Sequence, residues 1–185
     1  KQVEGHTICA LGEGPLWHPI RNSLFWFDIL GKQLHCRDEF SQNSWQFDEH
    51  VSAAGWVNET TLLMASETGL FKFDIESGTR DLLVPLEADN PVTRSNDGRA
   101  DPWGGFWIGT MGKDAEPGAG SIYRFYRGEL RKLYGDITIS NSICFASGGG
   151  WAYFSDTATQ IIQRVALDDE GWPDGDPEPY IRPMP

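Results

Sequence analysis

The sequence lacks the cysteine content of a disulfide-bonded or zinc-binding domain. Its 185 residues include three cysteines, Cys9, Cys36 and Cys144, which are odd in number and far apart. A disulfide framework needs pairs, and a zinc site needs close Cys-x-x-Cys spacing. We therefore predict buried free thiols, which favour a reducing compartment and a cytoplasmic location.

Long apolar runs and an excess of basic charge are also absent. No run approaches the roughly 20 residues that span a bilayer, and the N-terminal stretch has no signal-peptide core. Fifteen Lys and Arg stand against 27 Asp and Glu, for a net charge of −12, which disfavours a nucleic-acid backbone as partner. We expect neither a membrane nor a nucleic acid as a partner, and the oligomeric state stays open.

Helical periodicity and several catalytic motifs are missing as well. The four histidines, His6, His18, His35 and His50, show no His-Glu-x-x-His spacing. There is no Gly-x-Ser-x-Gly elbow, and no Gly-rich phosphate loop follows a strand and opens a helix. These absences argue against a zinc peptidase, a serine hydrolase of that type and a nucleotide-binding fold.

What the sequence does contain is a repeated pattern of short strands. Twenty-one Gly, 11 Pro and 8 Trp are typical of many turns around a packed interior. Apolar runs recur at 24–29, 61–65, 106–110 and 151–155, with equivalent positions 37, 44 and 46 residues apart. A second strand pattern follows each run, at 33–38, 70–74, 121–125 and 161–167. Third strands are expected at 45–50, 80–85, 129–134 and 179–181, and innermost strands at 14–17, 52–57, 95–100 and 142–146.

Four strands per unit, at a period near 40–45 residues, predict a β-propeller. We therefore expect an all-β chain that forms a single propeller domain over residues 1–185, with about four blades. A β-sandwich is the competing fold, but it does not predict this regularity.

Polar residues gather where the predicted innermost strands begin. Arg94, Asn96, Asp97 and Asp101 crowd into a stretch that we expect to be a loop feeding strand 106–110, because Asn-Asp-Gly is ordinary turn chemistry. The loops entering the innermost strands of a propeller converge at one end, so residues distant in sequence can meet there.

Carboxylate and amide oxygens at that end suit a hard divalent cation. Glu13 and Asn141 are the candidates that precede the first and fourth innermost strands. Taken singly, Glu13 also fits a solvated surface carboxylate, and Asn141 a strand-end cap.

Three segments together resemble one known family. GEGPLWHPIRNSLFWFDILGKQLHCRD, RSNDGRADPWGGFWIGTM and ISNSICFASGGGWAYFSDT are similar to motifs of the regucalcin (senescence marker protein) and gluconolactonase family, in the same order. The resemblance covers nearly the whole chain. It implies a six-bladed propeller with one divalent metal ion at the axial channel, so this chain would be truncated at its C-terminus.

The resemblance also implies roles for individual residues. Glu13 and Asn141 match metal ligands, and Arg94 and Asn96 match substrate-binding positions. Glu116 is similar in placement to a further substrate contact. The remaining ligand of the family, an Asp that would serve as general base, is expected beyond Pro185, so the catalytic residue is unassigned.

The implied activity is hydrolysis of a small-molecule sugar lactone, assisted by calcium, zinc or manganese. The alternative is a non-catalytic, calcium-binding regulatory propeller that holds an ion without turnover. A third possibility is a different hydrolysis on the same scaffold, since a fold does not determine a function. We also expect the 185-residue chain to expose an open blade edge and to associate.

Overall fold

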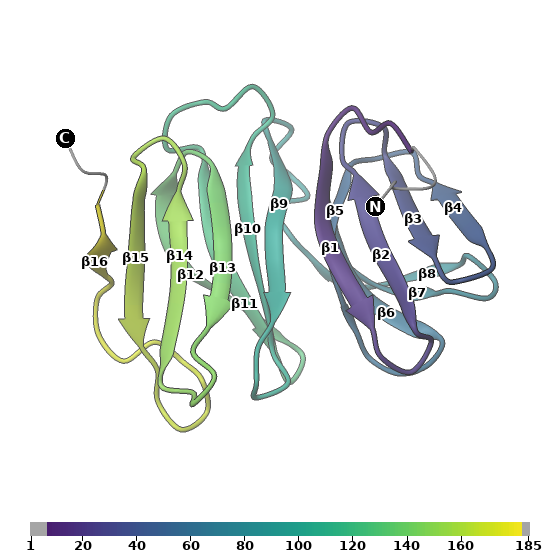
Figure 1. Cartoon of the computed structure of the whole chain (residues 1–185). Coiled ribbons are helices and arrows are strands. Elements are labelled where there is room, and N and C mark those ends of the chain that lie inside the picture. Colours follow the sequence, from purple (N-terminus) through teal and green to yellow (C-terminus); the bar gives the residue numbers. More distant parts are fainter. Residues whose placement is uncertain (1–6, 183–185) are drawn as a thin grey trace.

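The computed structural model describes residues 7–182, which form sixteen β-strands in four sheets (Figure 1). The first blade comprises β1 (Gly12–His18), β2 (Ser23–Asp28), β3 (Gln33–Arg37) and β4 (Gln42–Gln46). The second comprises β5 (Val51–Trp56), β6 (Thr61–Ser66), β7 (Gly69–Asp74) and β8 (Arg80–Pro85). The third comprises β9 (Thr93–Ala100), β10 (Phe106–Gly112), β11 (Gly120–Tyr126) and β12 (Glu129–Ile137). The fourth comprises β13 (Ser140–Phe145), β14 (Trp151–Asp156), β15 (Ile161–Ala166) and β16 (Glu178–Ile181).

Each sheet is a four-stranded antiparallel meander, which is the blade of a propeller. The prediction of an all-β propeller is thereby confirmed. Between residues 7 and 182 there is no helix, and hence none that could cross a membrane.

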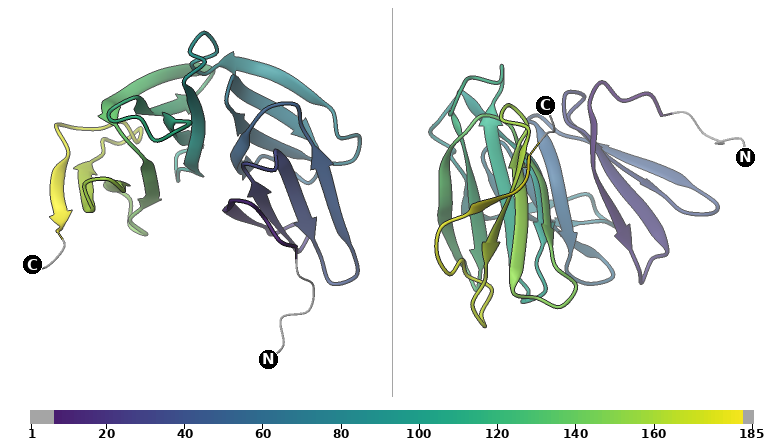
Figure 2. Two further views of the ribbon diagram at one scale, coloured as in Figure 1. Left: turned by 90° about the horizontal axis from the view of Figure 1, so that it is seen from above. Right: turned by 60° about the vertical axis from the view of Figure 1, so that its left-hand side comes forward.

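The four blades follow one another along an arc (Figure 2). The inner strands contact each other in the order β1, β5, β9 and β13. All four run in the same direction, so their first residues lie at one end of the molecule, together with the loops that leave β2, β6, β10 and β14. We call this end the entry face and the opposite end the far face.

Three apolar clusters hold the arc together, one between each pair of consecutive blades. Phe25 and Phe27 of the first blade pack with Leu62 and Met64 of the second, and all four side chains are fully buried. Burial of each such side chain stabilises the fold by roughly 1.5–3 kcal/mol. Because a middle blade has a neighbour on both sides, β10 is apolar at successive positions rather than alternating.

A β-bulge interrupts the pairing of every described inner strand with its neighbour. In the first blade Glu13 pairs with Phe27 and Leu16 with Phe25, so two residues of β1 oppose one of β2. The third and fourth blades have the same two-against-one arrangement, and the second has a shift at the corresponding place. Bulges re-aim side chains, so the start of each inner strand presents its residues differently from a regular strand.

Most expected strands agree with the structure, including the innermost strand expected at 95–100, which is part of β9. The turn expected at Asn-Asp-Gly is instead a bulge within β9. The third strand of the first unit is 42–46 rather than 45–50, because the Asp38 carboxylate accepts hydrogen bonds from the backbone of Phe40 and Ser41 and closes a tight turn. Of the three thiols, Cys36 is buried, whereas Cys9 is half-buried and Cys144 exposed.

Candidate functional site

Glu13 and Asn141 occupy equivalent positions on β1 and β13. Each is the last paired residue before the bulge, Glu13 opposite Phe27 and Asn141 opposite Ser155. The next residue in each strand has a left-handed backbone, with φ of 57° at Gly14 and 62° at Ser142. The structure thus presents both residues on the entry face in the same local geometry.

A buried aspartate at the end of the second strand anchors the segment that leads into each of these positions. Asp28 accepts hydrogen bonds from the backbone N–H of Ala10 and Leu11, at 2.9 Å each. Asp156 does the same for Thr138 and Ile139, at 2.9 and 3.0 Å. Sequence analysis missed both residues, although both come at the end of an apolar repeat strand.

Three backbone donors control the ionisation of Asp28. Burial raises the pKa of Asp28, but hydrogen bonds from the backbone of Leu11, Ala10 and Gly31 together lower it by more. The pKa of Asp28 therefore lies below its ordinary value. The ionised carboxylate is therefore the form that holds the segment before β1.

The Asn141 side chain is oriented by the fourth blade. Its Nδ2 donates to Oγ1 of Thr157 at 2.9 Å, and within the described residues its Oδ1 has no hydrogen-bond partner. The half-buried Glu13 carboxylate likewise makes no hydrogen bond in the described part of the chain. One amide oxygen and one carboxylate are thus left available on the entry face.

Arg94 and Asn96, on β9 between these two positions, form a buried pair. Nη1 of Arg94 donates to Oδ1 of Asn96 at 2.8 Å and to the carbonyl of Ser95 at 2.9 Å. Nδ2 of Asn96 donates to the carbonyl of Ser140 at 2.8 Å, which links β9 to β13. Asn96 thus holds Arg94 in place, with both ends of its amide engaged by the protein.

The charge of Arg94 is balanced by two carboxylates. Burial lowers the pKa of Arg94 below its ordinary value. The negative charges of Glu13 and, next in size, Glu67 act in the opposite direction. Nε of Arg94 is buried and has no hydrogen-bond partner. A buried donor without a partner is costly, so this nitrogen is suited to bind an oxygen of a ligand.

Asp97 joins two blades rather than forming a turn. Its Oδ2 accepts a hydrogen bond from the backbone N–H of Ile143, at 2.7 Å, in the bulge of β13. Burial raises the pKa of Asp97 above its ordinary value, despite this hydrogen bond and the nearby charge of Arg99. Asp97 therefore has a structural role, because it fixes β9 against β13.

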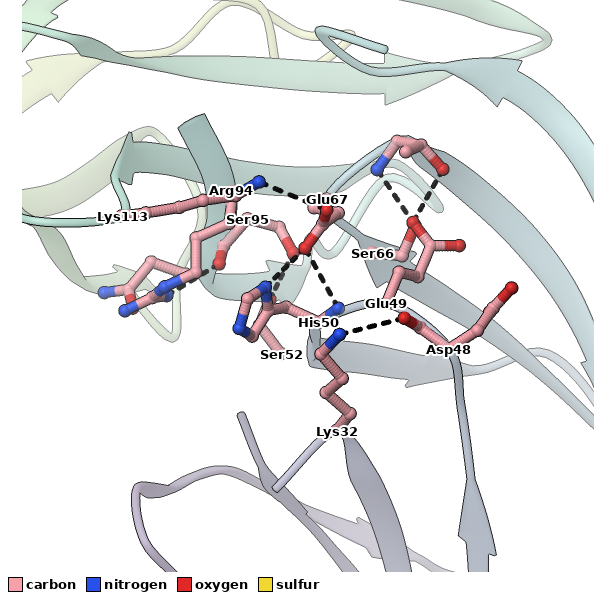
Figure 3. Close-up of polar contacts among 12 residues, drawn as sticks. Lys32, Asp48, Glu49, His50, Ser52, Ser66, Glu67, Arg94, Ser95 and Lys113 are labelled. Carbon is pink, nitrogen blue, oxygen red and sulfur yellow. Dashed lines mark hydrogen bonds and ion pairs between the residues drawn. The ribbon is translucent and has the colours of Figure 1, made fainter. Parts of the chain in front are cut away.

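Figure 3 shows a second polar group on the entry face, beside Arg94. The Glu67 carboxylate contacts Nδ1 of His50 and accepts a hydrogen bond from the His50 backbone N–H at 3.1 Å. Nζ of Lys113 donates to its other oxygen at 3.2 Å. Burial raises the pKa of Glu67, but the hydrogen bonds from His50 and Lys113 lower it by more, so the group is ionised at neutral pH.

Two further polar residues considered in the sequence analysis, Glu116 and Asp101, are bound by parts of the chain other than the Arg94–Asn96 pair. Glu116 is on the loop between β10 and β11, where its Oε2 accepts a hydrogen bond from the backbone of Asp114 at 3.1 Å. Asp101 is at the far face, in a fully buried ion pair with Arg124 at 2.7 Å. Glu116 is therefore on the entry face but bound to its own loop, and Asp101 is structural.

A cavity of about 320 Å³ lies between β1, β5 and β9. It extends from the bulge residues Gly14 and Asp97 to Trp17, Trp56 and Arg99. Ligand pockets commonly occupy about 300–1,000 Å³. Glu13, Arg94, Asn96 and Asn141 do not line this cavity, which runs along the inner strands from the bulges toward the far face.

The available donors fit a hard divalent cation in type. Carboxylate and amide oxygens are ligands that calcium and manganese accept, and zinc also binds carboxylates. Among residues 7–182, no group of three or more His, Cys, Asp or Glu side chains could hold a metal. Glu13 and Asn141 could therefore supply two ligands, and further oxygen donors would have to complete the site.

Residues 11–179 match the family described as the SMP-30/Gluconolactonase/LRE-like region. The chain belongs to this family. The expected family resemblance is thereby confirmed.

Individual relatives show the same relationship. The chain is 33% identical over 169 residues to the 6-deoxy-6-sulfogluconolactonase of Pseudomonas putida, covering 89% of this chain and 57% of that protein. It is 41% identical over 173 residues to a Rhizobium meliloti (strain 1021) protein provisionally named a sugar lactone lactonase, covering 90% and 58%. A calcium-binding regucalcin from Agrobacterium tumefaciens aligns with a TM-score of 0.92 and 42% identity, over 94% of this chain and 60% of that one. The chain thus spans less than two thirds of the length of each.

Proposed function

We propose that the protein is a metal-dependent hydrolase that opens a sugar lactone. The observation that carries the proposal is the equivalent placement of Glu13 and Asn141, each before a bulge and each with an uncommitted oxygen. Relatives that are named lactonases support the substrate class. A cytoplasmic location remains our expectation.

The residues of this chain have separate tasks in the proposed reaction. A divalent ion held by Glu13 and Asn141 would polarise the lactone carbonyl as a Lewis acid and favour its attack by water. Arg94 presents its buried Nε to a hydroxyl or ring oxygen of the sugar. Asn96 keeps the Arg94 guanidinium in this orientation by accepting its Nη1–H. Glu116 is proposed as a substrate contact only if its carboxylate leaves the Asp114 backbone.

The second candidate is a non-catalytic calcium-binding propeller, favoured by the similarity to a calcium-binding regucalcin. Both candidates use the same ligands. They differ in whether a bound lactone is turned over.

The deciding experiment measures acid release from D-glucono-1,5-lactone by the longest product of this gene. The rate is compared with the spontaneous rate, first with a chelator and then with added calcium, zinc or manganese. We expect a metal to restore activity, and Glu13→Gln and Asn141→Ala to abolish that metal-dependent rate. Tight metal binding without turnover of any lactone would instead establish the non-catalytic propeller.

A further inference from the structure

We propose that the third and fourth blades form a second binding site, for a flat, uncharged molecule that carries an amide or a hydroxyl group. A cavity of about 420 Å³ lies between β12 of the third blade and β14 and β15 of the fourth. Its lining includes Thr159, on the loop that leaves β14, so one end of the cavity is at the entry face. Glu13, Arg94, Asn96 and Asn141 do not line it, so the proposal does not rest on the proposed lactonase function.

Aromatic and apolar side chains form the walls of this cavity. The rings of Tyr134 and Phe154 stack across the two blades, with centroids 5.0 Å apart and an interplanar angle of 21°. Leu133 and Ile137, which also line the cavity, belong to the same apolar cluster as both rings. Because ligand pockets are mostly apolar and aromatic, these walls suit the flat apolar body of a ligand.

Two polar groups in the lining lack a hydrogen-bond partner. Oη of Tyr134 and Oε1 of Gln163 are buried, and neither makes a hydrogen bond within the described part of the chain. Gln163 pairs directly with Phe154, so both side chains leave the sheet on the same face, toward the third blade. Buried polar groups without partners are costly, so a ligand that satisfies them is bound more tightly.

The chemistry of these two groups defines the polar part of the ligand. Burial, and then the negative charge of Asp176, raises the pKa of Tyr134 to about 12, so its hydroxyl is protonated at neutral pH and can donate. Oε1 of Gln163 can only accept. The ligand therefore needs both an acceptor and a donor, which an amide or a hydroxyl group supplies.

The charges around the cavity disfavour an anion. Asp136 and Asp156 are in the lining, and the charge of Asp176 acts on Tyr134, whereas Lys132 is a cation beside this stretch of β12. The carboxylate of Asp156 already accepts hydrogen bonds from three backbone N–H groups, so it is not free to pair with a cation. An uncharged ligand avoids both the repulsion and an unpaired buried charge.

The test uses benzamide as the probe, because its ring is flat and its amide both accepts and donates hydrogen bonds. Benzamide is titrated into the longest product of this gene and followed by ¹H–¹⁵N NMR. We expect saturable shifts of the backbone signals of residues 133–137, 154 and 163. Benzoate, which has the same shape and a negative charge, is the matched control ligand and should bind more weakly.

Two variants separate ligand binding from folding. Tyr134→Phe and Gln163→Leu each remove one hydrogen bond to the probe, so the Kd for benzamide should rise about 2–10-fold in each. Tyr134→Phe also removes a buried hydroxyl without a partner, so without benzamide it should be at least as stable to urea as wild type. Tyr153→Phe is the matched control and should leave the Kd unchanged, because Tyr153 precedes Phe154 in β14 and contacts Tyr180 on the other face.

Several results would overturn the proposal. Benzamide could cause no saturable shift at the cavity, benzoate could bind as tightly, or both variants could keep the wild-type Kd. A Tyr134→Phe protein that is less stable than wild type would show that the hydroxyl serves the fold rather than a ligand. Since none of these measurements uses lactone turnover or a metal, failure of the lactonase assay would leave this assignment intact, and the reverse also holds.

Discussion

At the scale of single residues, side chains that hold other side chains matter as much as those that face the site. Asn96 uses its whole amide to connect Arg94 with the carbonyl of Ser140. The sequence identified Asn96 and Asp97 as polar residues of this stretch. It did not identify their partners, because these lie on β13, more than 40 residues away.

Replacing Asn96 tests the bridge. Asn96→Ala leaves the Ser140 carbonyl without its donor and frees Arg94 to reorient, at a cost of roughly 1–3 kcal/mol in unfolding free energy. We expect KM for the lactone to rise more than it does in Glu13→Gln, because substrate positioning is lost. Steady-state kinetics and urea denaturation measure both effects. Equal, mild kinetic effects of the two substitutions would contradict the assigned roles.

Asp156 offers a second test at this scale. Asp156→Ala removes the acceptor for the Thr138 and Ile139 backbone, so the segment before Asn141 is no longer anchored. We expect calcium affinity, measured by calorimetry on the longest gene product, to fall about 10–100-fold, the usual effect of losing a residue that orients a ligand. The control is Asp74→Ala, which removes a similar turn acceptor at the far face and should leave affinity unchanged.

At the scale of elements, strand positions were largely predictable and bulges were not. Recurring apolar runs predicted the central strands of the blades, because their side chains pack on neighbouring blades. A bulge depends on backbone conformation, and Ser142, with φ of 62°, has no special sequence signature. The Asn-Asp-Gly sequence was therefore expected to be a turn, although it forms the bulge of β9 against β10.

Opposite substitutions at the two equivalent bulges should have opposite effects on stability. Ser142→Gly relieves a left-handed backbone that costs roughly 1–2 kcal/mol, so we expect a net gain of about 0.5–1 kcal/mol after the entropy of glycine is included. Gly14→Ala adds that cost, and its Cβ would lie 2.3 Å from the carbonyl oxygen of Ser52. Urea unfolding of both variants tests this, and a stable Gly14→Ala protein would refute the assigned conformation.

At the scale of the whole molecule, stability depends on carboxylates that fold in the ionised form. The pKa values of Asp28, Asp38, Glu67 and Asp74 are lowered in the folded protein, whereas that of Asp97 is raised by burial. A lowered pKa means that the unfolded chain binds more protons as the pH falls, so acid favours unfolding.

We therefore expect the urea midpoint to fall as the pH drops below 4.5, the ordinary pKa of Glu67. Asp97 opposes this trend, since its stabilising contribution is present at low pH and is lost as the pH rises through its folded pKa. Asp28→Asn should be less stable than wild type at neutral pH and should lose less stability on acidification. An equal acid dependence in both proteins would show that Asp28 is not responsible.

Self-association is a further property of the whole 185-residue chain. The first blade exposes large apolar side chains, among them Trp17, Leu24, Leu30 and Phe40. Leu24 lies on β2 on the face opposite Phe25, which packs on the second blade. We expect light scattering to show concentration-dependent association of the 185-residue chain that Leu24→Lys reduces. A monodisperse wild-type monomer would contradict this expectation.

The bulge recurs in all four inner strands of the described chain, yet only β1 and β13 carry a candidate ligand at it. Geometry that redirects a side chain is therefore a property of the blade, independent of the metal. A chain that grows by duplicating a blade inherits this geometry with each copy. The equivalent positions on β5 and β9 are Val51 and Ser95, and both side chains are fully buried, so neither could take up a ligand role without a change in packing.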